Sequence, residues 1–188
     1  IQNGASLLKR LELLGVDVGS RWDGLVEYAE QQIGDHVLSF TDLHSVVALA
    51  ATNKAGALKK YLASLEEFAN TPDNYSASIT DSFVLPISHG VIAFENGEYQ
   101  QAADILWPMR DQWAPIGGSH AQRDVFTQIL IESTIEAGQL DRARTLLSQR
   151  LTIRPNSMGS WQKYADVLNK LGLKDKADYA TIRAQGIH

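Results

Sequence analysis

The residues best suited to chemistry near the start of the sequence are His36, Asp42 and His44. Imidazole and carboxylate groups can transfer protons or bind a metal ion. One straight helix cannot bring both histidines to one ion, because a separation of eight residues spans about 12 Å, and Asp42 and His44 would point to different faces. A zinc site would need the loop 34–40 to fold His36 back and a third ligand, such as His120, from elsewhere. We therefore expect no metal and no other cofactor, and histidines that hydrogen-bond neighbouring turns.

A second polar group lies in the segment Gly117-Gly118-Ser119-His120-Ala121-Gln122-Arg123-Asp124. Ser119 and, three residues later, Gln122 form the pattern of a capping box at a helix start. The alternative is an anion site, in which free backbone amides and the side chains of His120 and Arg123 bind a carboxylate or phosphate. The glycine pair exceeds what a cap needs, so both interpretations stay open. The candidate ligand pocket built from these two groups comprises His36, Asp42, His44, Gly117, Gly118, Ser119, His120, Arg123 and Asp124.

The elements that must position these residues are helices. Apolar residues recur with a helical period, as in Leu7, Leu8, Leu11 and Leu14, and no run alternates strictly enough to predict a strand. The chain is therefore predicted to be all-α.

Glycines show how the helices are organised. Gly15, Gly56, Gly97 and Gly138 are separated by 41 residues each, and Gly172 follows 34 residues after the last. Each follows an apolar helical pattern, where a left-handed turn favours glycine. Five helix–turn–helix units at a fixed period predict a solenoid.

The units resemble tetratricopeptide repeats. The resemblance rests on the stretches Gly97–Ala102 and Gly138–Ala143, on Pro155 and Trp161 in register, and on the 34-residue spacing from Ala143 to Ala177. It implies an α-solenoid of about five helix–turn–helix units that forms a single domain over residues 1–188.

Four motifs also resemble the tetratricopeptide repeat protein 38-like family: Asn3–Leu8, Asp35-His36, Asp42–His44 and Gly117–Phe126. Members of that family are much longer, so the resemblance implies that this chain is the C-terminal portion of a longer array. The family pattern has an aromatic residue where Lys9 stands. The family's biochemical role is poorly defined, so the resemblance implies a fold and little chemistry.

In tetratricopeptide repeats, the first helix of each unit lines a concave face. Transferring that geometry predicts a candidate groove that consists of Val46, Ala50, Val84, Ile87, Val91, Phe94, Val125, Gln128 and Glu132. The groove favours a scaffold or interaction module with a protein or peptide partner, and not an enzyme. The alternative is a ligand-binding or catalytic protein that uses the candidate ligand pocket.

Composition narrows the classes of partner. The formal net charge of −5 argues against a nucleic-acid binder. The longest aliphatic run, Val46–Ala51, is far too short to span a membrane, so we expect no membrane partner. The chain has no cysteine, which fits a reducing compartment, and we expect a cytoplasmic protein. Nine basic and four acidic residues in the range 141–183 could steer an acidic partner there.

The two ends of the array lead to different expectations. Leucines crowd the first helix, at positions 7, 8, 11, 13 and 14, whereas the last helix, Lys174–Gln185, is mostly polar. Terminal repeat units need a polar outer face. We therefore expect the first hairpin to pack against the missing N-terminal part of the same chain or against a second copy.

Overall fold

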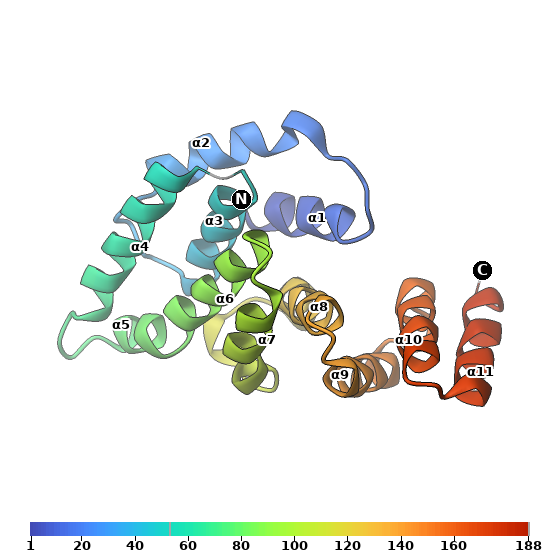
Figure 1. Cartoon of the computed structure of the whole chain (residues 1–188). Coiled ribbons are helices and arrows are strands. Elements are labelled where there is room, and N and C mark those ends of the chain that lie inside the picture. The colour runs from blue at the N-terminus through green and yellow to red at the C-terminus, as the bar shows by residue number, and fades with distance from the viewer. Residues whose placement is uncertain (53, 188) are drawn as a thin grey trace. The chain divides into compact units, whose positions relative to one another are not determined.

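The computed structural model describes residues 1–52 and 54–187, and every regular element in these ranges is helical (Figure 1). The helices form two compact units, unit 1 (residues 1–130) and unit 2 (residues 131–188), and the boundary falls inside α8 (His120–Glu136). The predicted all-α helical repeat is confirmed. The prediction of one domain stays a prediction, since a single helix belongs to both units.

Unit 1 contains seven α-helices and the first part of α8. They are α1 (Gln2–Glu12), α2 (Asp23–Gln31), α3 (Ser39–Ala51), α4 (Ala55–Ala69), α5 (Tyr75–Ile79), α6 (Leu85–Glu95) and α7 (Tyr99–Leu106), with short 3₁₀ turns at Gly19–Trp22, Trp107–Met109 and Ala114–Ile116. Helix α3 lies at the centre and contacts α1, α2, α4 and α6 (Figure 1). It is apolar nearly all round, and such a helix must be buried on every side. Accordingly, Leu43 and the run Val46–Leu49 are wholly buried.

All five helical hairpins share one backbone hydrogen bond at the turn. An amide three or four residues past the end of the helix donates to a carbonyl five residues earlier, which is the longer bond of a Schellman motif. The bonds join Val16 to Leu11 (3.0 Å), Lys54 to Leu49 (3.2 Å), Glu98 to Ala93 (2.8 Å), Gln139 to Thr134 (2.9 Å) and Leu173 to Leu168 (2.9 Å). This shared bond confirms five helix–turn–helix units.

The predicted glycine register is right at four turns and wrong at one. Gly15, Gly97, Gly138 and Gly172 have φ between 69° and 77°, the left-handed conformation that was expected. Gly56 instead lies in the first turn of α4. Helix α3 ends earlier than the spacing suggested, because the bond from Lys54 to Leu49 already closes the turn.

The run Tyr75–Glu95 is one continuous helical stretch made of α5, a π-helical turn at Thr80–Val84 and α6. Pro86 explains the π turn: proline has no N–H, and its ring would collide with the carbonyl of Ser82, so the backbone widens before it. By length and composition alone, this is the one helix among the described residues that could cross a membrane. Half of its most apolar stretch is buried, and α6 packs against α3 and α7 as a core helix would.

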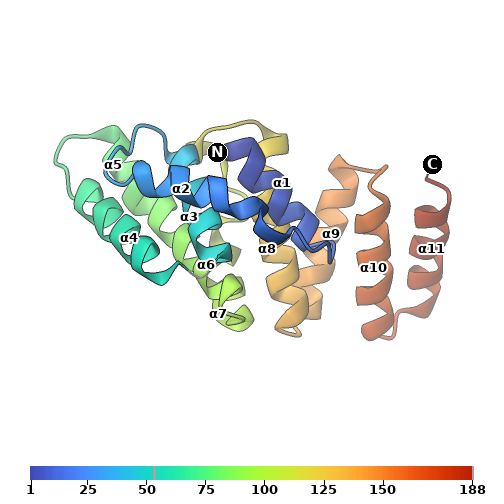
Figure 2. The same ribbon diagram turned by 90° about the horizontal axis from the view of Figure 1, so that it is seen from above.

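Unit 2 continues the hairpin pattern with the end of α8, α9 (Leu140–Ile153), α10 (Met158–Lys170) and α11 (Lys174–Gln185). Helices α10 and α11 run side by side (Figure 2). Small residues let them approach closely: the core between them consists of Ala165, Leu168, Ala177 and Ala180, with Trp161, Tyr164 and Leu173 packed against it.

The expectation that the first hairpin packs against another part of the chain or a second copy stays a prediction. Leu7 and Leu14 are 56% and 64% exposed, whereas Leu8 is buried in unit 1. The last helix is less polar outside than predicted, since Tyr179 and Ile182 are 57% and 66% exposed. Both helices therefore present apolar side chains to solvent.

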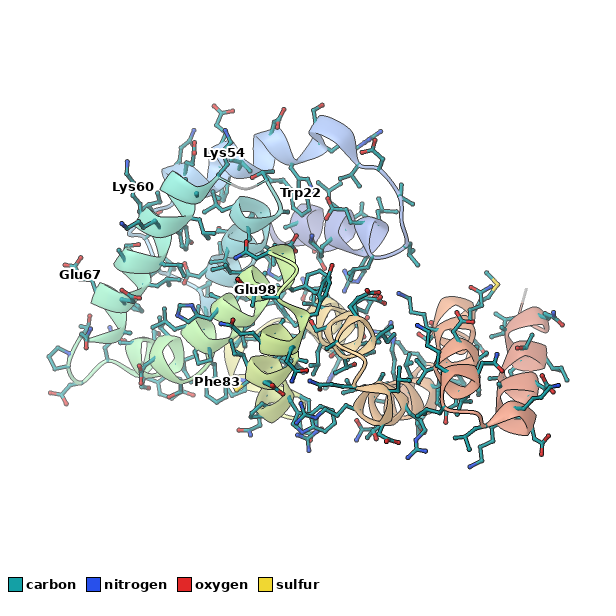
Figure 3. All side chains as sticks on the ribbon, in the orientation of Figure 1. Trp22, Lys54, Lys60, Glu67, Phe83 and Glu98 are labelled. Carbon is teal, nitrogen blue, oxygen red and sulfur yellow. The ribbon has the colours of Figure 1, made fainter. Side chains whose placement is uncertain are left out.

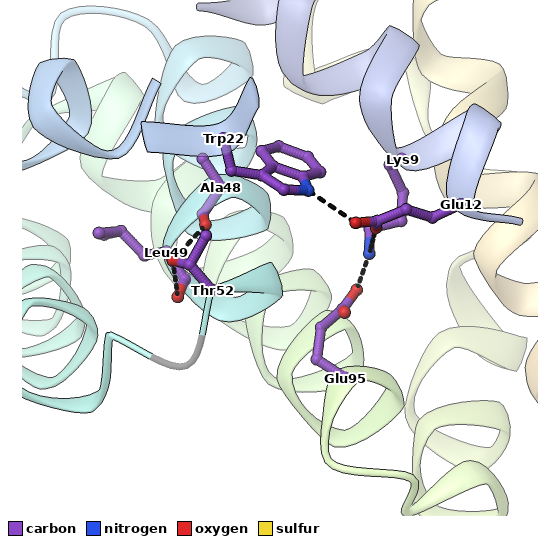
Figure 4. Close-up of polar contacts among 7 residues, drawn as sticks. All are labelled: Lys9, Glu12, Trp22, Ala48, Leu49, Thr52 and Glu95. Atoms are coloured by element: carbon purple, nitrogen blue, oxygen red, sulfur yellow. Dashed lines mark hydrogen bonds and ion pairs between the residues drawn. The ribbon is translucent and has the colours of Figure 1, made fainter. Parts of the chain in front are cut away.

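A buried ion cluster holds α1 to the end of α6 (Figure 4). Lys9 is only 2% exposed, and its ammonium lies 2.6 Å from a Glu12 carboxylate oxygen and 2.7 Å from one of Glu95. The Trp22 indole donates to Glu12 over 2.7 Å, and the Lys9 ammonium lies 5.7 Å from its ring centroid. Burial raises the pKa of Glu95, and Lys9 opposes that rise. Lys9 thus has a specific packing role.

Candidate functional site

His36 and Asp42 meet in a buried hydrogen-bond network between the α2–α3 loop and α4. The loop does fold His36 back, with φ of 39° at His36 itself. Its Nδ1 lies 3.1 Å from Asp42 Oδ1, and its Nε2 lies 2.9 Å from the hydroxyl of Ser64. The Tyr61 hydroxyl donates to the same Asp42 oxygen over 2.7 Å. Four side chains from three segments therefore form one connected chain of polar contacts.

The contacts of the network indicate which tautomer a neutral His36 ring adopts. Asp42 Oδ1 accepts the Tyr61 hydroxyl, so the His36 Nδ1 that faces the same oxygen is the N–H donor. In a neutral ring, Nε2 then carries a lone pair that faces Ser64. The rings of Tyr61 and Phe68, at 5.9 Å and 5.3 Å, hold the imidazole plane. Burial and the Asp42 carboxylate raise the pKa of Tyr61.

His44 lies outside this network. This agrees with the prediction that Asp42 and His44, two residues apart on one helix, point to different faces. His44 is wholly buried, and its Nδ1 donates to the Phe40 carbonyl over 2.7 Å. The rings of Phe40 and Phe126 lie 4.3 Å and 5.4 Å from it. Burial lowers its pKa to about 4, so the ring is neutral at neutral pH. His44 is a core histidine, and its inclusion in the candidate ligand pocket was wrong.

The loop before α8 is a capped helix start. The Ser119 amide donates to the Gln122 side chain over 2.8 Å, and the Gln122 amide donates to the Ser119 hydroxyl over 3.3 Å, which confirms the capping box. Arg123 is buried and donates to the carbonyls of Gly117 (3.0 Å) and Gly118. The arginine needed for the anion site therefore holds its own loop together.

The glycine pair also has a structural reason. Gly117 and Gly118 have φ of 86° and 71°, and a Cβ added at Gly118 would lie 2.8 Å from the Phe40 ring. The loop thus packs directly on the first turn of α3. His120 is exposed, with Nδ1 3.5 Å from the Arg123 guanidinium, and Asp124 accepts from Gln128 over 2.8 Å.

The candidate ligand pocket therefore does not form as one site. His36 and Asp42 come together, while the residues of the 117–124 loop satisfy one another locally. Within residues 1–52 and 54–187, no three histidine, aspartate or glutamate side chains are grouped as a metal site requires. Tyr61 and Ser64 were missed, although their spacing of three residues places both on one face of α4.

Most of the candidate groove lies in the core. Six of its residues are buried: Val46, Ala50, Val84, Ile87, Val91 and Val125. The helix faces assigned to a concave surface are covered, because α1 and α2 pack on α3, while α6 packs on α3 and α7. Phe94 is half-buried against Tyr99, and Glu132 pairs with Lys163 in unit 2. The predicted groove is therefore wrong for Val46, Val84, Ile87, Val91 and Val125.

A real hollow of about 420 Å³ lies elsewhere in unit 1, between the end of α3, the start of α4 and the end of α6. Its floor is apolar and half-buried, and exposed polar side chains stand at its rim. We call this cavity the α3–α4–α6 hollow. It is lined by Ala50, Ala55, Leu58, Lys59, Leu62, Ala63, Glu66, Ile92 and Asn96. It shares Ala50 with the predicted groove.

Comparison with known proteins agrees with this fold. No protein-family model matches the chain. A solved structure named "MamA AMB-1 C2221" superposes with a TM-score of 0.54 at 20% sequence identity, over 98% of this chain and 99% of that chain. MamA contains tetratricopeptide repeats, so the similarity confirms a fold of this type. The narrower resemblance to the tetratricopeptide repeat protein 38-like family stays a prediction.

Proposed function

We propose that this chain is an interaction module that binds a short apolar segment of a partner protein in the α3–α4–α6 hollow. The observation that carries the proposal is the hollow itself, which joins two successive hairpins of a helical-repeat fold. Stacked hairpins build extended binding surfaces of this kind. A volume of about 420 Å³ falls within the roughly 300–1,000 Å³ typical of ligand sites.

The chemistry of the hollow favours an apolar ligand with polar flanks. Leu58, Leu62 and Ile92 are half-buried and form an apolar floor. Lys59 and Glu66 are exposed at the rim, one of each charge, so they can pair with charges on either side of a bound segment. An apolar floor with a polar rim is the usual arrangement of a protein interface.

Selection from a phage-displayed library of random dodecapeptides tests the proposal. The library is selected on the immobilised chain, and enriched peptides are synthesised and titrated by fluorescence anisotropy. Ala63→Arg is the blocking variant, because Ala63 is exposed and the added side chain fills the hollow without disturbing the core. The control is Glu67→Arg, which lies on the same helix and projects into solvent (Figure 3).

The proposal predicts apolar peptides whose affinity falls at least tenfold with Ala63→Arg and stays within twofold with Glu67→Arg. Peptides that bind both variants equally would contradict it, since their site would lie outside the hollow.

A further inference from the structure

We propose that Ser64 is an activated nucleophile that takes an acyl group from an ester, with His36 as its general base and Asp42 as a positioning residue. The proposal goes beyond the interaction module and does not depend on it. It assigns a reaction to the place in unit 1 where Ser64 of α4 meets His36 of the α2–α3 loop.

The geometry is that of a serine–histidine–aspartate triad. The Ser64 hydroxyl lies 2.9 Å from His36 Nε2, and His36 Nδ1 lies 3.1 Å from Asp42 Oδ1. Such triads occur on unrelated folds and are recognised by geometry and by the role of each group. Both nitrogens of one imidazole are used, one toward a hydroxyl and one toward a carboxylate. That is the arrangement that lets histidine accept a proton from serine.

The environment gives each group its role. Ser64 is half-buried, whereas His36 and Asp42 are 6% and 3% exposed. The Tyr61 hydroxyl holds the Asp42 carboxylate oxygen that orients the imidazole. His36 has a φ of 39°, a conformation uncommon outside glycine, and such backbone strain is found at functional sites.

The hydroxyl hydrogen of Ser64 has two acceptors, which sets up the reaction. It can point to the Tyr61 carbonyl at 3.0 Å or to His36 Nε2 at 2.9 Å. In the second position the proton can pass to Nε2 as Ser64 Oγ bonds to the carbonyl carbon of the ester. The ester C–O bond then breaks, and the leaving alcohol takes the proton from Nε2. Water completes the cycle by the same proton transfers, releasing the carboxylic acid and restoring Ser64.

The surface beside the network indicates the kind of ester. Val37 and Leu38 directly follow His36 and are 79% and 59% exposed. Exposed apolar side chains in the loop that carries the general base favour a substrate with an apolar acyl group.

Labelling with a biotinylated fluorophosphonate tests the proposal on the full chain. The reagent phosphonylates an activated serine with loss of fluoride, and peptide mass spectrometry locates the modified residue. Ser78 is the internal control: it is exposed, and its hydroxyl donates to a carbonyl three residues earlier, over 2.7 Å, just as Ser64 can. No imidazole contact is described for it, whereas Ser64 has His36.

We expect Ser64 to be labelled at least 100-fold faster than Ser78, the range that a general base contributes. His36→Asn should remove that advantage, because asparagine tolerates the same backbone conformation but accepts no proton. The wild-type chain should also release one equivalent of p-nitrophenol rapidly from p-nitrophenyl acetate, and Ser64→Ala should not.

Two results would overturn the proposal. One is labelling of Ser64 no faster than Ser78 in the wild-type chain, a comparison that needs no variant to fold. The other is an unchanged labelling rate in folded His36→Asn, which would leave the network as a structural link between the loop and α4.

Discussion

Four glycines of unit 1 separate two costs of adding one methyl group to the backbone. Gly118 combines a φ of 71° with a neighbour 2.8 Å from an added Cβ, whereas Gly97 has a φ of 77° and nothing within 4 Å. At Gly90 an added Cβ lies 2.5 Å from Leu106 Cγ without a positive φ, and Gly56 has neither feature. Alanine at the four positions therefore forms a two-by-two comparison.

The expected losses follow from these two features. The left-handed backbone costs alanine about 1–2 kcal/mol, and overpacking costs about 1–3 kcal/mol. Gly97→Ala should lose only the cost of the left-handed backbone, about 1–2 kcal/mol of stability. Gly118→Ala should lose both costs, about 2–5 kcal/mol in total. Gly90→Ala should lose only the cost of overpacking, about 1–3 kcal/mol, reduced by a small gain in helix propensity. Gly56→Ala should gain about 0.4–1 kcal/mol, because it lies in a helix with open space around it.

Urea unfolding followed by circular dichroism measures all four free energies, provided the slopes agree. A double-mutant cycle then assigns the excess at Gly118 to its neighbour: in a Phe40→Leu background, Gly118→Ala should cost no more than Gly97→Ala. The reasoning is refuted if Gly118→Ala costs the same as Gly97→Ala in the wild-type chain. It is equally refuted if the excess persists once the Phe40 ring is gone.

Two further predictions concern buried charge. Burial lowers the pKa of His44 from 6.5 to about 4, so between those pH values the unfolded chain binds a proton there that the folded chain does not. The free energy of unfolding should fall by up to about 3 kcal/mol as the pH drops through that window. In urea titrations at several pH values, His44→Asn should remove that part of the pH dependence. The same dependence of the unfolding free energy on pH in both chains would contradict this. Lys9→Ala should lose about 3–5 kcal/mol of stability, because it leaves Glu12 and Glu95 without their cation. The double variant Lys9→Met with Glu95→Gln should recover much of that loss. Equal losses in the two variants would show that packing, and not charge, determines the effect.

The features that the sequence predicts correctly are local ones. Apolar periodicity and glycine at a left-handed turn are settled within about ten residues, so the hairpins around Gly97, Gly138 and Gly172 were predictable. The capping box at Ser119 is equally local, as is the divergence of Asp42 and His44 on one helix. The prediction for Gly56 failed because the presence of a glycine does not by itself distinguish a turn between helices from the exposed first turn of a helix.

The features that the sequence does not predict depend on contacts between distant segments. Lys9 reads as a surface residue until Glu95, 86 residues away, is placed beside it. Val46 has the periodicity of a groove residue, and only the packing of α1 and α2 on α3 shows that it is core. Ser64 carries no signal of its own, since its significance comes from the loop that folds His36 onto α4.

Hydrogen exchange with a selected dodecapeptide bound tests the proposed binding site most directly. If the α3–α4–α6 hollow is the interaction site, exchange should slow in the first turns of α4 and at the end of α6, around Leu58, Leu62 and Ile92. Ala63→Arg should abolish that protection, while Glu67→Arg should preserve it. Protection confined to other helices, or protection that survives Ala63→Arg, would contradict the account.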